Sequence, residues 1–136
     1  MILLPNFICP GAQKAATTSL YNILKLHPDV FLPDIKEPQF FAVDKKYKNG
    51  LEWYEKKYYS NVSEEKIIGD ISTGYMAIEH SAERIANDLG TNIKIIFLLR
   101  NPVDRAYSHY WMEKNKYFEV ESFERALELE EERKKK

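Results

Sequence analysis

Residues 7–19 read FICPGAQKAATTS. The apolar run from Phe7 to Cys9 indicates a short buried strand, Gly11 opens a turn, and helical residues follow. A turn that leads into a helix exposes backbone N–H groups at the helix N-terminus, where the helix dipole also favours anions. Lys14 adds a positive charge, and hydroxyl donors follow at Thr17, Thr18 and Ser19. This stretch therefore predicts a phosphate-binding loop between a strand and a helix.

Further strands and helices follow this loop in alternation. Apolar runs predict strands at 67–70 and 93–99, and the second is nearly unbroken, as parallel strands covered on both faces require. Helical spacing predicts helices over 18–26, 81–89, 102–112 and 122–136, the last with Ser122 as N-cap and Glu–Lys pairs four residues apart. A short helix is also expected to carry the aromatic residues Trp53, Tyr54, Tyr58 and Tyr59. This order is typical of an α/β fold with a parallel central sheet.

The composition excludes several classes of protein. With 136 residues, of which 44% are hydrophobic and 30% charged, the chain fits one soluble globular domain over residues 1–136. The net charge of −1 predicts no nucleic-acid partner. No signal peptide or membrane span is visible, so we expect a cytoplasmic protein. One cysteine and the scattered His27, His80 and His109 predict no disulfide and no metal site.

The loop differs from the magnesium-dependent phosphate loop of nucleotide triphosphatases. In that pattern a glycine precedes the lysine, and the lysine directly precedes the hydroxyl residue that holds the metal. Here two residues separate Lys14 from Thr17, and Gln13 stands before the lysine. A nucleotide kinase of the P-loop type is therefore the weaker alternative.

The loop instead resembles the 5′-phosphosulfate loop of sulfotransferases that use 3′-phosphoadenosine 5′-phosphosulfate (PAPS), which reads much like G-x-x-K-[AS]-G-T-[ST]. The resemblance implies that PAPS is held by Gln13, Lys14, Ala15, Ala16, Thr17, Thr18 and Ser19. The family usually has glycine where this chain has Ala16. If the backbone there needs a positive φ, alanine is strained; if it needs only close approach, alanine is tolerated.

A second segment follows the strand predicted at 93–99. It begins at Arg100 and reads RNPVDRAYS as far as Ser108, with Pro102 suited to a first helical turn. Arg100 is thus expected at the carboxyl end of a parallel strand, where open α/β sheets bind ligands. The segment looks very much like the 3′-phosphate motif R-[ND]-P-x-[DE]-R-x-x-S of the same family. That resemblance implies that Arg100 and Ser108 hold the 3′-phosphate of PAPS.

Two carboxylates are candidates for the general base. The segment Lys36-Glu37-Pro38-Gln39-Phe40-Phe41 resembles [KE]-E-x-[HQ]-F-F of the glycan-modifying, heparan sulfate type branch and its bacterial relatives, which implies that Glu37 takes the acceptor's proton. Lys14 then stabilises the leaving phosphate, and Lys36 is either a ligand of the sulfonate or acceptor, or a solvated lysine. Asp70, at the end of a strand, is the second candidate base, with a structural role as its alternative.

The resemblance implies a P-loop-like three-layer fold, of which this chain is the front part, apparently truncated at its C-terminus. It implies transfer of a sulfuryl group from PAPS to a hydroxyl or amine, without a metal because lysine and arginine supply the charge. The match of 36–41, and of Gly50-Leu51-Glu52-Trp53-Tyr54 to G-[LI]-x-W-Y, favours a saccharide or glycolipid acceptor. A truncated, non-catalytic nucleotide-binding module is the other alternative.

Overall fold

The computed structural model describes residues 3–135. The chain divides into two compact units, Met1–Leu99 and Arg100–Lys136, and each is described by itself. The single domain expected from the sequence stays a prediction. No helix among the described residues is long and apolar enough to cross a membrane.

The first unit is built on a parallel sheet. Within the described residues the sheet has the order β2-β3-β1-β4, with β1 at Phe7–Gly11, β2 at Val30–Phe31, β3 at Ile67–Ile71 and β4 at Lys94–Phe97. All three neighbouring pairs are parallel. The strands predicted at 7–9, 67–70 and 93–99 are thus confirmed. β2 was not predicted, because two residues are too few for a period to show.

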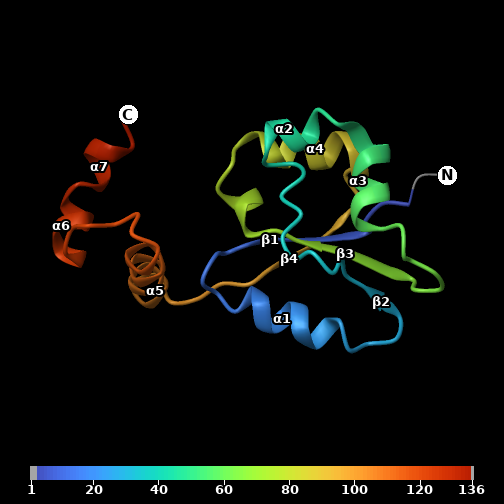
Figure 1. Cartoon of the computed structure of the whole chain (residues 1–136), viewed down its shortest axis with the longest axis horizontal. Coiled ribbons are helices and arrows are strands. Elements are labelled where there is room, and N and C mark those ends of the chain that lie inside the picture. Colours follow the sequence, from blue (N-terminus) through green and yellow to red (C-terminus); the bar gives the residue numbers. More distant parts are fainter. Residues whose placement is uncertain (1–2, 136) are drawn as a thin grey trace. The chain divides into compact units, whose positions relative to one another are not determined.

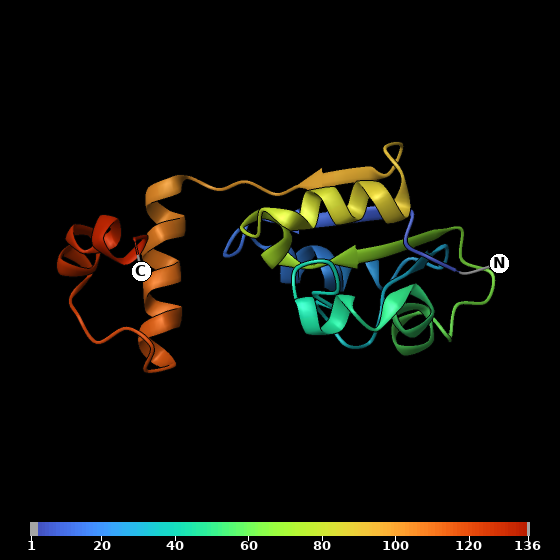
Figure 2. The same ribbon diagram turned by 90° about the horizontal axis from the view of Figure 1, so that it is seen from above.

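Helices cover both faces of this sheet (Figures 1 and 2). α1 (Thr17–Leu24) lies on one face, and α2 (Asp44–Tyr47), α3 (Gly50–Tyr58) and α4 (His80–Leu89) lie on the other. A short 3₁₀ helix, η1 (Thr73–Met76), follows β3 directly. The three-layer α/β fold is therefore confirmed, as are the helices predicted at 18–26 and 81–89 to within two residues of their ends.

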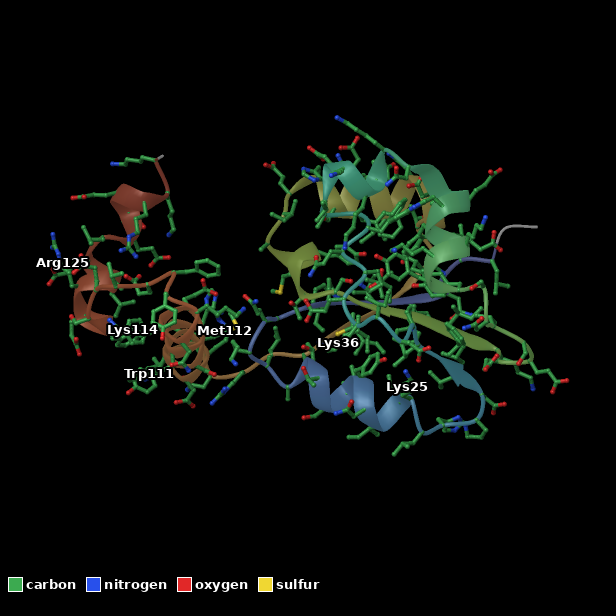
Figure 3. The ribbon with its side chains drawn as sticks, in the orientation of Figure 1. Lys25, Lys36, Trp111, Met112, Lys114 and Arg125 are labelled. Atoms are coloured by element: carbon green, nitrogen blue, oxygen red, sulfur yellow. The ribbon has the colours of Figure 1, made fainter. Side chains whose placement is uncertain are left out.

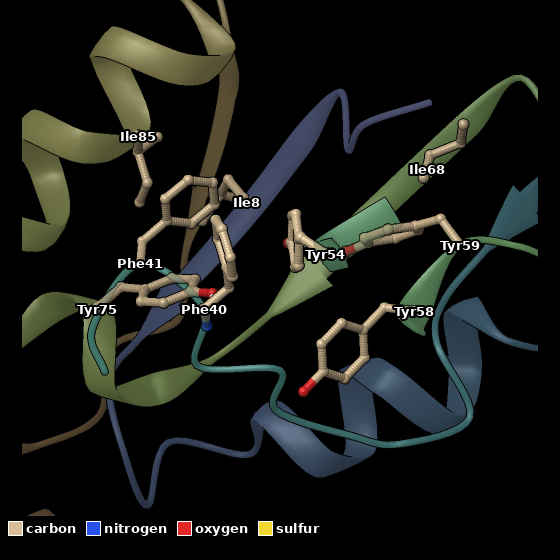
Figure 4. Close-up of a cluster of buried hydrophobic side chains, with 9 residues drawn as sticks. All are labelled: Ile8, Phe40, Phe41, Tyr54, Tyr58, Tyr59, Ile68, Tyr75 and Ile85. Atoms are coloured by element: carbon tan, nitrogen blue, oxygen red, sulfur yellow. Dashed lines mark hydrogen bonds between the residues drawn. The ribbon is translucent and has the colours of Figure 1, made fainter. Parts of the chain in front are cut away.

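Side chains of β1 alternate between two cores, as the strand period of two requires. Phe7 and Cys9 pack with residues such as Tyr21 on the α1 side. Ile8 packs on the other side in an aromatic cluster that Figure 4 shows, with Ile85 reaching it from α4. The absence of a side chain at Gly69 on β3 leaves room for the Phe7 ring, since a Cβ there would lie 2.2 Å from the Phe7 Cζ.

β4 lies at the edge of the sheet, and this differs from the expectation that it is covered on both faces. Ile95, Ile96 and Phe97 are 40%, 38% and 56% exposed. On one face the physical reason is that α4 does not close over β4 and leaves a groove between them. β4 also has β1 on one side and no further strand of the described sheet on the other, so its outer backbone edge is unpaired within that sheet. Ile93, Ile95 and Phe97 line an apolar groove of about 460 Å³ beside α4.

The second unit is helical. α5 (Pro102–Asn115) is followed by α6 (Phe123–Glu128) and α7 (Glu130–Arg133). The N-cap predicted at Ser122 is confirmed, because its side chain accepts the Arg125 amide. The single helix predicted over 122–136 is wrong: α6 ends at Glu128, and the ψ of −7° at its C-cap Leu129 departs from the regular helix. Residue 136 lies outside the described residues.

Candidate functional site

The phosphate loop begins at the carboxyl end of β1. Gly11 has a φ of +144°, and a Cβ there would lie 3.3 Å from the Met76 Cβ and 3.4 Å from the Thr73 carbonyl oxygen. Glycine thus allows the loop to pass close to η1. The next amide, that of Ala12, donates to the Leu98 carbonyl at 2.8 Å. The loop therefore lies where β1, β3 and β4 end, which is where open parallel sheets bind ligands.

The loop backbone is left-handed at two residues before the helix. Lys14 has a φ of +67° and Ala16 a φ of +68°. Ala16 is the N-cap of α1, and its methyl side chain offers no acceptor to the first-turn amides of that helix. A positive φ at Ala16 decides between the two sequence-based alternatives: this backbone conformation costs an alanine roughly 1–2 kcal/mol, so the residue is strained.

Glu37 lies on the loop between β2 and α2 and is held by three donors. Its Oε1 accepts from Lys36 Nζ at 2.7 Å, and its Oε2 accepts from Gln39 Nε2 at 3.0 Å and Thr73 Oγ1 at 3.1 Å. Partial burial raises the pKa of the Glu37 carboxyl, but these hydrogen bonds and the Lys36 charge outweigh it and hold the pKa below its ordinary value. Glu37 is therefore ionised at neutral pH, with 31% of its side chain exposed.

Figure 3 labels Lys36 within the first unit. Its side chain is 24% exposed. Of its two sequence-based interpretations, the freely solvated lysine does not fit this ion pair with Glu37. Because water screens the pair only partly, the Lys36 charge favours the ionised form of Glu37 and helps to orient its carboxylate.

The backbone that carries Glu37 is held in an unusual shape. Glu37 and Gln39 have φ values of +58° and +54°, which non-glycine residues rarely adopt. Pro38, between them, is fully buried, and its carbonyl accepts from Lys46 Nζ at 2.5 Å. Such strain costs of order 1–3 kcal/mol for each residue and persists only where surrounding contacts enforce it. It marks this loop as a functional candidate.

Asp70, the other candidate base, has a different environment. Its side chain lies inside the core with 0% exposure. Its carboxylate accepts from the hydroxyls of Tyr54, Ser72 and Tyr75 at 2.5–2.6 Å. Burial raises the pKa of Asp70 above its ordinary value, although the three hydrogen bonds act in the opposite direction. All of its close partners are protein groups that fix it in place.

The second motif lies in the other unit. Arg100 directly precedes Asn101, the N-cap of α5, whose side-chain oxygen accepts the amides of Val103 at 3.0 Å and Asp104 at 3.4 Å. Pro102 occupies the first turn, as predicted. Ser108 is half-buried two turns further along the same helix. Because the two units are described separately, the joint binding of one nucleotide by Lys14 and Arg100 stays a prediction.

Comparison with known proteins shows the family to which the chain belongs. The family model described as the sulfotransferase domain matches residues 4–135. The chain belongs to the sulfotransferase domain family. A crystal structure of a sulfotransferase from Alicyclobacillus acidocaldarius superimposes with a TM-score of 0.83 at 32% identity, over 98% of this chain and 60% of that one.

Curated relatives of this sulfotransferase domain include proteins from eukaryotes. A membrane-associated sulfotransferase, kil1 of Dictyostelium discoideum, is 36% identical over 96% of this chain and 29% of its own length. The heparan sulfate glucosamine 3-O-sulfotransferase 5 of Homo sapiens is 36% identical over 79% of this chain and 30% of its own length. The chain thus spans about 30% of the length of these two relatives.

Several residues of this sulfotransferase site escaped the sequence analysis. Thr73 and Gln39 bind the Glu37 carboxylate, and Ser72 and Tyr75 connect Asp70 to the Glu37 loop. A signal was present for three of them, since two hydroxyl residues and an aromatic follow the end of a predicted parallel strand, where a site was expected. Their partners could not be read from the sequence, because they lie 33–36 residues away.

Proposed function

We propose that this chain carries the donor loop and the general base of an enzyme that moves a sulfuryl group from PAPS to a hydroxyl or amine of a saccharide. The observation that carries the proposal is the Glu37 carboxylate. It is partly exposed, ionised, fixed by three donors, and joined through Thr73 to the edge of the sheet where the phosphate loop begins. Membership of the sulfotransferase domain family supports the reaction class.

The residues of the loop suit the 5′-phosphosulfate of PAPS. The turn through Lys14 and Ala16 leads directly into α1, so the first-turn amides of α1 and the Lys14 ammonium favour an anion there. Arg100 and Ser108 are assigned to the 3′-phosphate from their motif. A guanidinium can hold a phosphate through two parallel hydrogen bonds, which a lysine cannot do.

The proposed step is a displacement at sulfur. The acceptor oxygen or nitrogen forms a bond to sulfur while the bond from sulfur to the bridging phosphate oxygen breaks. Its electron pair stays on that oxygen, near Lys14, and the acceptor's proton passes to the Glu37 carboxylate. The products are the sulfated acceptor and adenosine 3′,5′-bisphosphate.

Glu37 suits the role of base better than Asp70. A base must come within hydrogen-bonding distance of the acceptor, and Glu37 has the exposed carboxylate. Asp70 has no exposed surface, and all three of its hydroxyl partners belong to the protein. We therefore assign Asp70 a supporting role.

A saccharide acceptor is supported by the names of relatives. Besides the 3-O-sulfotransferase, the N-deacetylase/N-sulfotransferase 4 of Mus musculus, named for heparan sulfate, is 39% identical over 79% of this chain. Together these names cover transfer to oxygen and to nitrogen, so both a hydroxyl and an amine remain candidate acceptors. The nucleotide kinase that the sequence left open finds no support in the matched family.

The first test is calorimetric titration with adenosine 3′,5′-bisphosphate and, separately, with AMP. We expect tighter binding of the bisphosphate, and we expect Arg100→Ala to remove that preference because a charged phosphate contact is lost. Equal binding of both nucleotides by the folded wild-type chain would contradict the assignment of the 3′-phosphate site.

The second test is turnover with PAPS and a glucosamine-containing oligosaccharide. Glu37→Gln should lower turnover about 10²–10⁴-fold, the usual contribution of a general base, while leaving bisphosphate affinity nearly unchanged. The matched control is Glu52→Gln, on the exposed side of α3. Equal turnover by wild type and Glu37→Gln would exclude Glu37 as the base. Binding without turnover by the wild-type chain would favour the non-catalytic binding module.

A further inference from the structure

Asp70 is a buried acid that takes no direct part in the proposed reaction step. Its Oδ1 accepts from Ser72 Oγ at 2.6 Å, and its Oδ2 accepts from the Tyr75 hydroxyl at 2.6 Å and the Tyr54 hydroxyl at 2.5 Å. In each of these bonds the hydroxyl is the donor and an Asp70 oxygen is the acceptor. A hydroxyl has one proton to give. Asp70 therefore fixes the proton of each hydroxyl and leaves the hydroxyl oxygens as acceptors.

Two of these oxygens face the loop that carries Glu37. The Gln39 amide donates to Ser72 Oγ at 3.0 Å, and the Phe40 amide donates to the Tyr75 oxygen at 3.0 Å. The Gln39 amide belongs to one of the two left-handed residues of that loop, and the Phe40 amide follows it directly. The shape of the loop is not one that its own residues prefer. The two hydroxyls thus supply tertiary contacts that hold the loop in this shape.

Packing fixes the position of these hydroxyls. Tyr75 is 4% exposed, and its ring meets the edge of Phe41 with centroids 5.6 Å apart (Figure 4). Ser72 is fully buried at the end of β3. Neither hydroxyl can turn to water for an alternative partner, so both depend on Asp70 for their direction.

We propose that Asp70 is a positioning residue for Glu37. Through the hydroxyls of Ser72 and Tyr75 it holds the Gln39 and Phe40 amides, and thereby sets the Glu37 carboxylate against its three donors. This inference rests on the proposed role of Glu37 as base. The other titratable groups that interact with Asp70 are Cys9, Lys46, Tyr54, Tyr58 and Tyr59. The charged group bonded to Glu37 is Lys36.

The test removes one hydroxyl at a time, in Tyr75→Phe and in Ser72→Ala. Two readouts need no turnover: the pKa of Glu37, from an NMR titration of its side-chain carboxyl, and the exchange rates of the Gln39 and Phe40 amides. We expect the pKa of Glu37 to rise toward its ordinary value of 4.5 in both variants. We also expect the amide that loses its acceptor to exchange at least about tenfold faster.

The matched control is Tyr59→Phe. It also removes a buried hydroxyl of the aromatic cluster, but that hydroxyl bonds to Tyr54 and to the Gly69 carbonyl and not to the Glu37 loop. Both readouts should stay at their wild-type values in this variant. Circular dichroism shows whether each variant is folded, and Ser72→Ala, which loses a single oxygen atom, carries the test if Tyr75→Phe unfolds.

The two proposals fail in different ways. Unchanged pKa and exchange in the folded hydroxyl variants overturn the positioning role, whatever the turnover. Full turnover by Glu37→Gln overturns the role of Glu37 as base. It does not affect the pKa and amide-exchange results from the hydroxyl variants. If both proposals hold, the acidic limb of the pH–rate profile shifts to higher pH in Tyr75→Phe, because a base with a higher pKa is protonated at higher pH.

Discussion

Ala16 occupies a backbone position that suits glycine. Its φ of +68° and ψ of 23° lie in the left-handed region, where the alanine Cβ crowds the following carbonyl. The family pattern has glycine at this position, and the sequence alone left open whether positive φ or close approach was the reason. The structure gives positive φ as the reason, so the departure from the family pattern has a cost in stability.

We therefore predict that Ala16→Gly stabilises the chain. Relief of the strain should raise the free energy of unfolding by up to about 1 kcal/mol, the strain being partly offset by the larger entropy that glycine has in the unfolded state. Urea unfolding measures this change. Ala15→Gly is the control, because Ala15 is not among the residues with positive φ and should lose stability. Equal effects of the two substitutions would contradict the explanation.

The residues that the sequence could not place are those whose conformation is imposed from a distance. Glu37 was found from its motif, but neither it nor Gln39 has an intrinsic preference for the left-handed region. Their shape depends on contacts with Ser72 and Tyr75, which follow a different strand. Local sequence therefore suggested Glu37 as the candidate base without predicting what holds it.

At the scale of the element, the start of α5 explains a choice within its motif. The pattern accepts asparagine or aspartate at the position of Asn101. In the structure this side chain caps the helix, with its Oδ1 accepting the amides of Val103 and Asp104. Both residue types offer such an acceptor, and both are strong N-caps. The motif thus combines Arg100, the proposed phosphate ligand, with a capping residue that fixes where the helix begins.

We predict that Asn101→Ala destabilises α5 by about 1 kcal/mol, while Asn101→Asp keeps most of the wild-type stability. Aspartate retains the acceptor and adds a negative charge that the helix N-terminus favours. Hydrogen exchange of the first-turn amides, together with urea unfolding, distinguishes the two variants. If alanine and aspartate weakened the first turn equally, the side-chain cap would not be what holds it.

Helices of eight or more residues and the apolar strands were predicted well, whereas the two-residue strand β2 and the break between α6 and α7 were not. α1 and α4 have apolar residues at helical spacing and a clear stop, such as Gly90 after α4. β2 has two residues and is defined by its pairing of Val30 with Ile67 and Phe31 with Ile68. No glycine or proline in the sequence marks the break between α6 and α7 at Leu129. Contacts, rather than local propensity, define these features.

At the scale of the whole molecule, the order of the strands decides both the site and its surroundings. Because β1 lies between β3 and β4, the loops after these strands meet at one edge of the sheet. The alternation of strands and helices in the sequence predicted the parallel sheet that brings these loops to one edge, but it did not predict the strand order. The exposure of β4 did not follow, because an apolar strand in a sequence predicts burial but cannot show which partner supplies it.

The exposed edge has a consequence in solution. Unpaired edge strands with apolar side chains pair readily with other chains. The only charged residue of β4 is Lys94, at its start, and the exposed Ile95, Ile96 and Phe97 that follow carry no charge. We predict that this chain self-associates through β4, and that Ile95→Lys weakens the association constant at least tenfold, which corresponds to about 1.4 kcal/mol. Ile23→Lys, at an equally apolar and 67% exposed position on α1, is the control. Sedimentation velocity over a range of concentrations measures both. A wild-type chain that stays monomeric, or the same loss in both variants, would show that the β4 edge is not the contact.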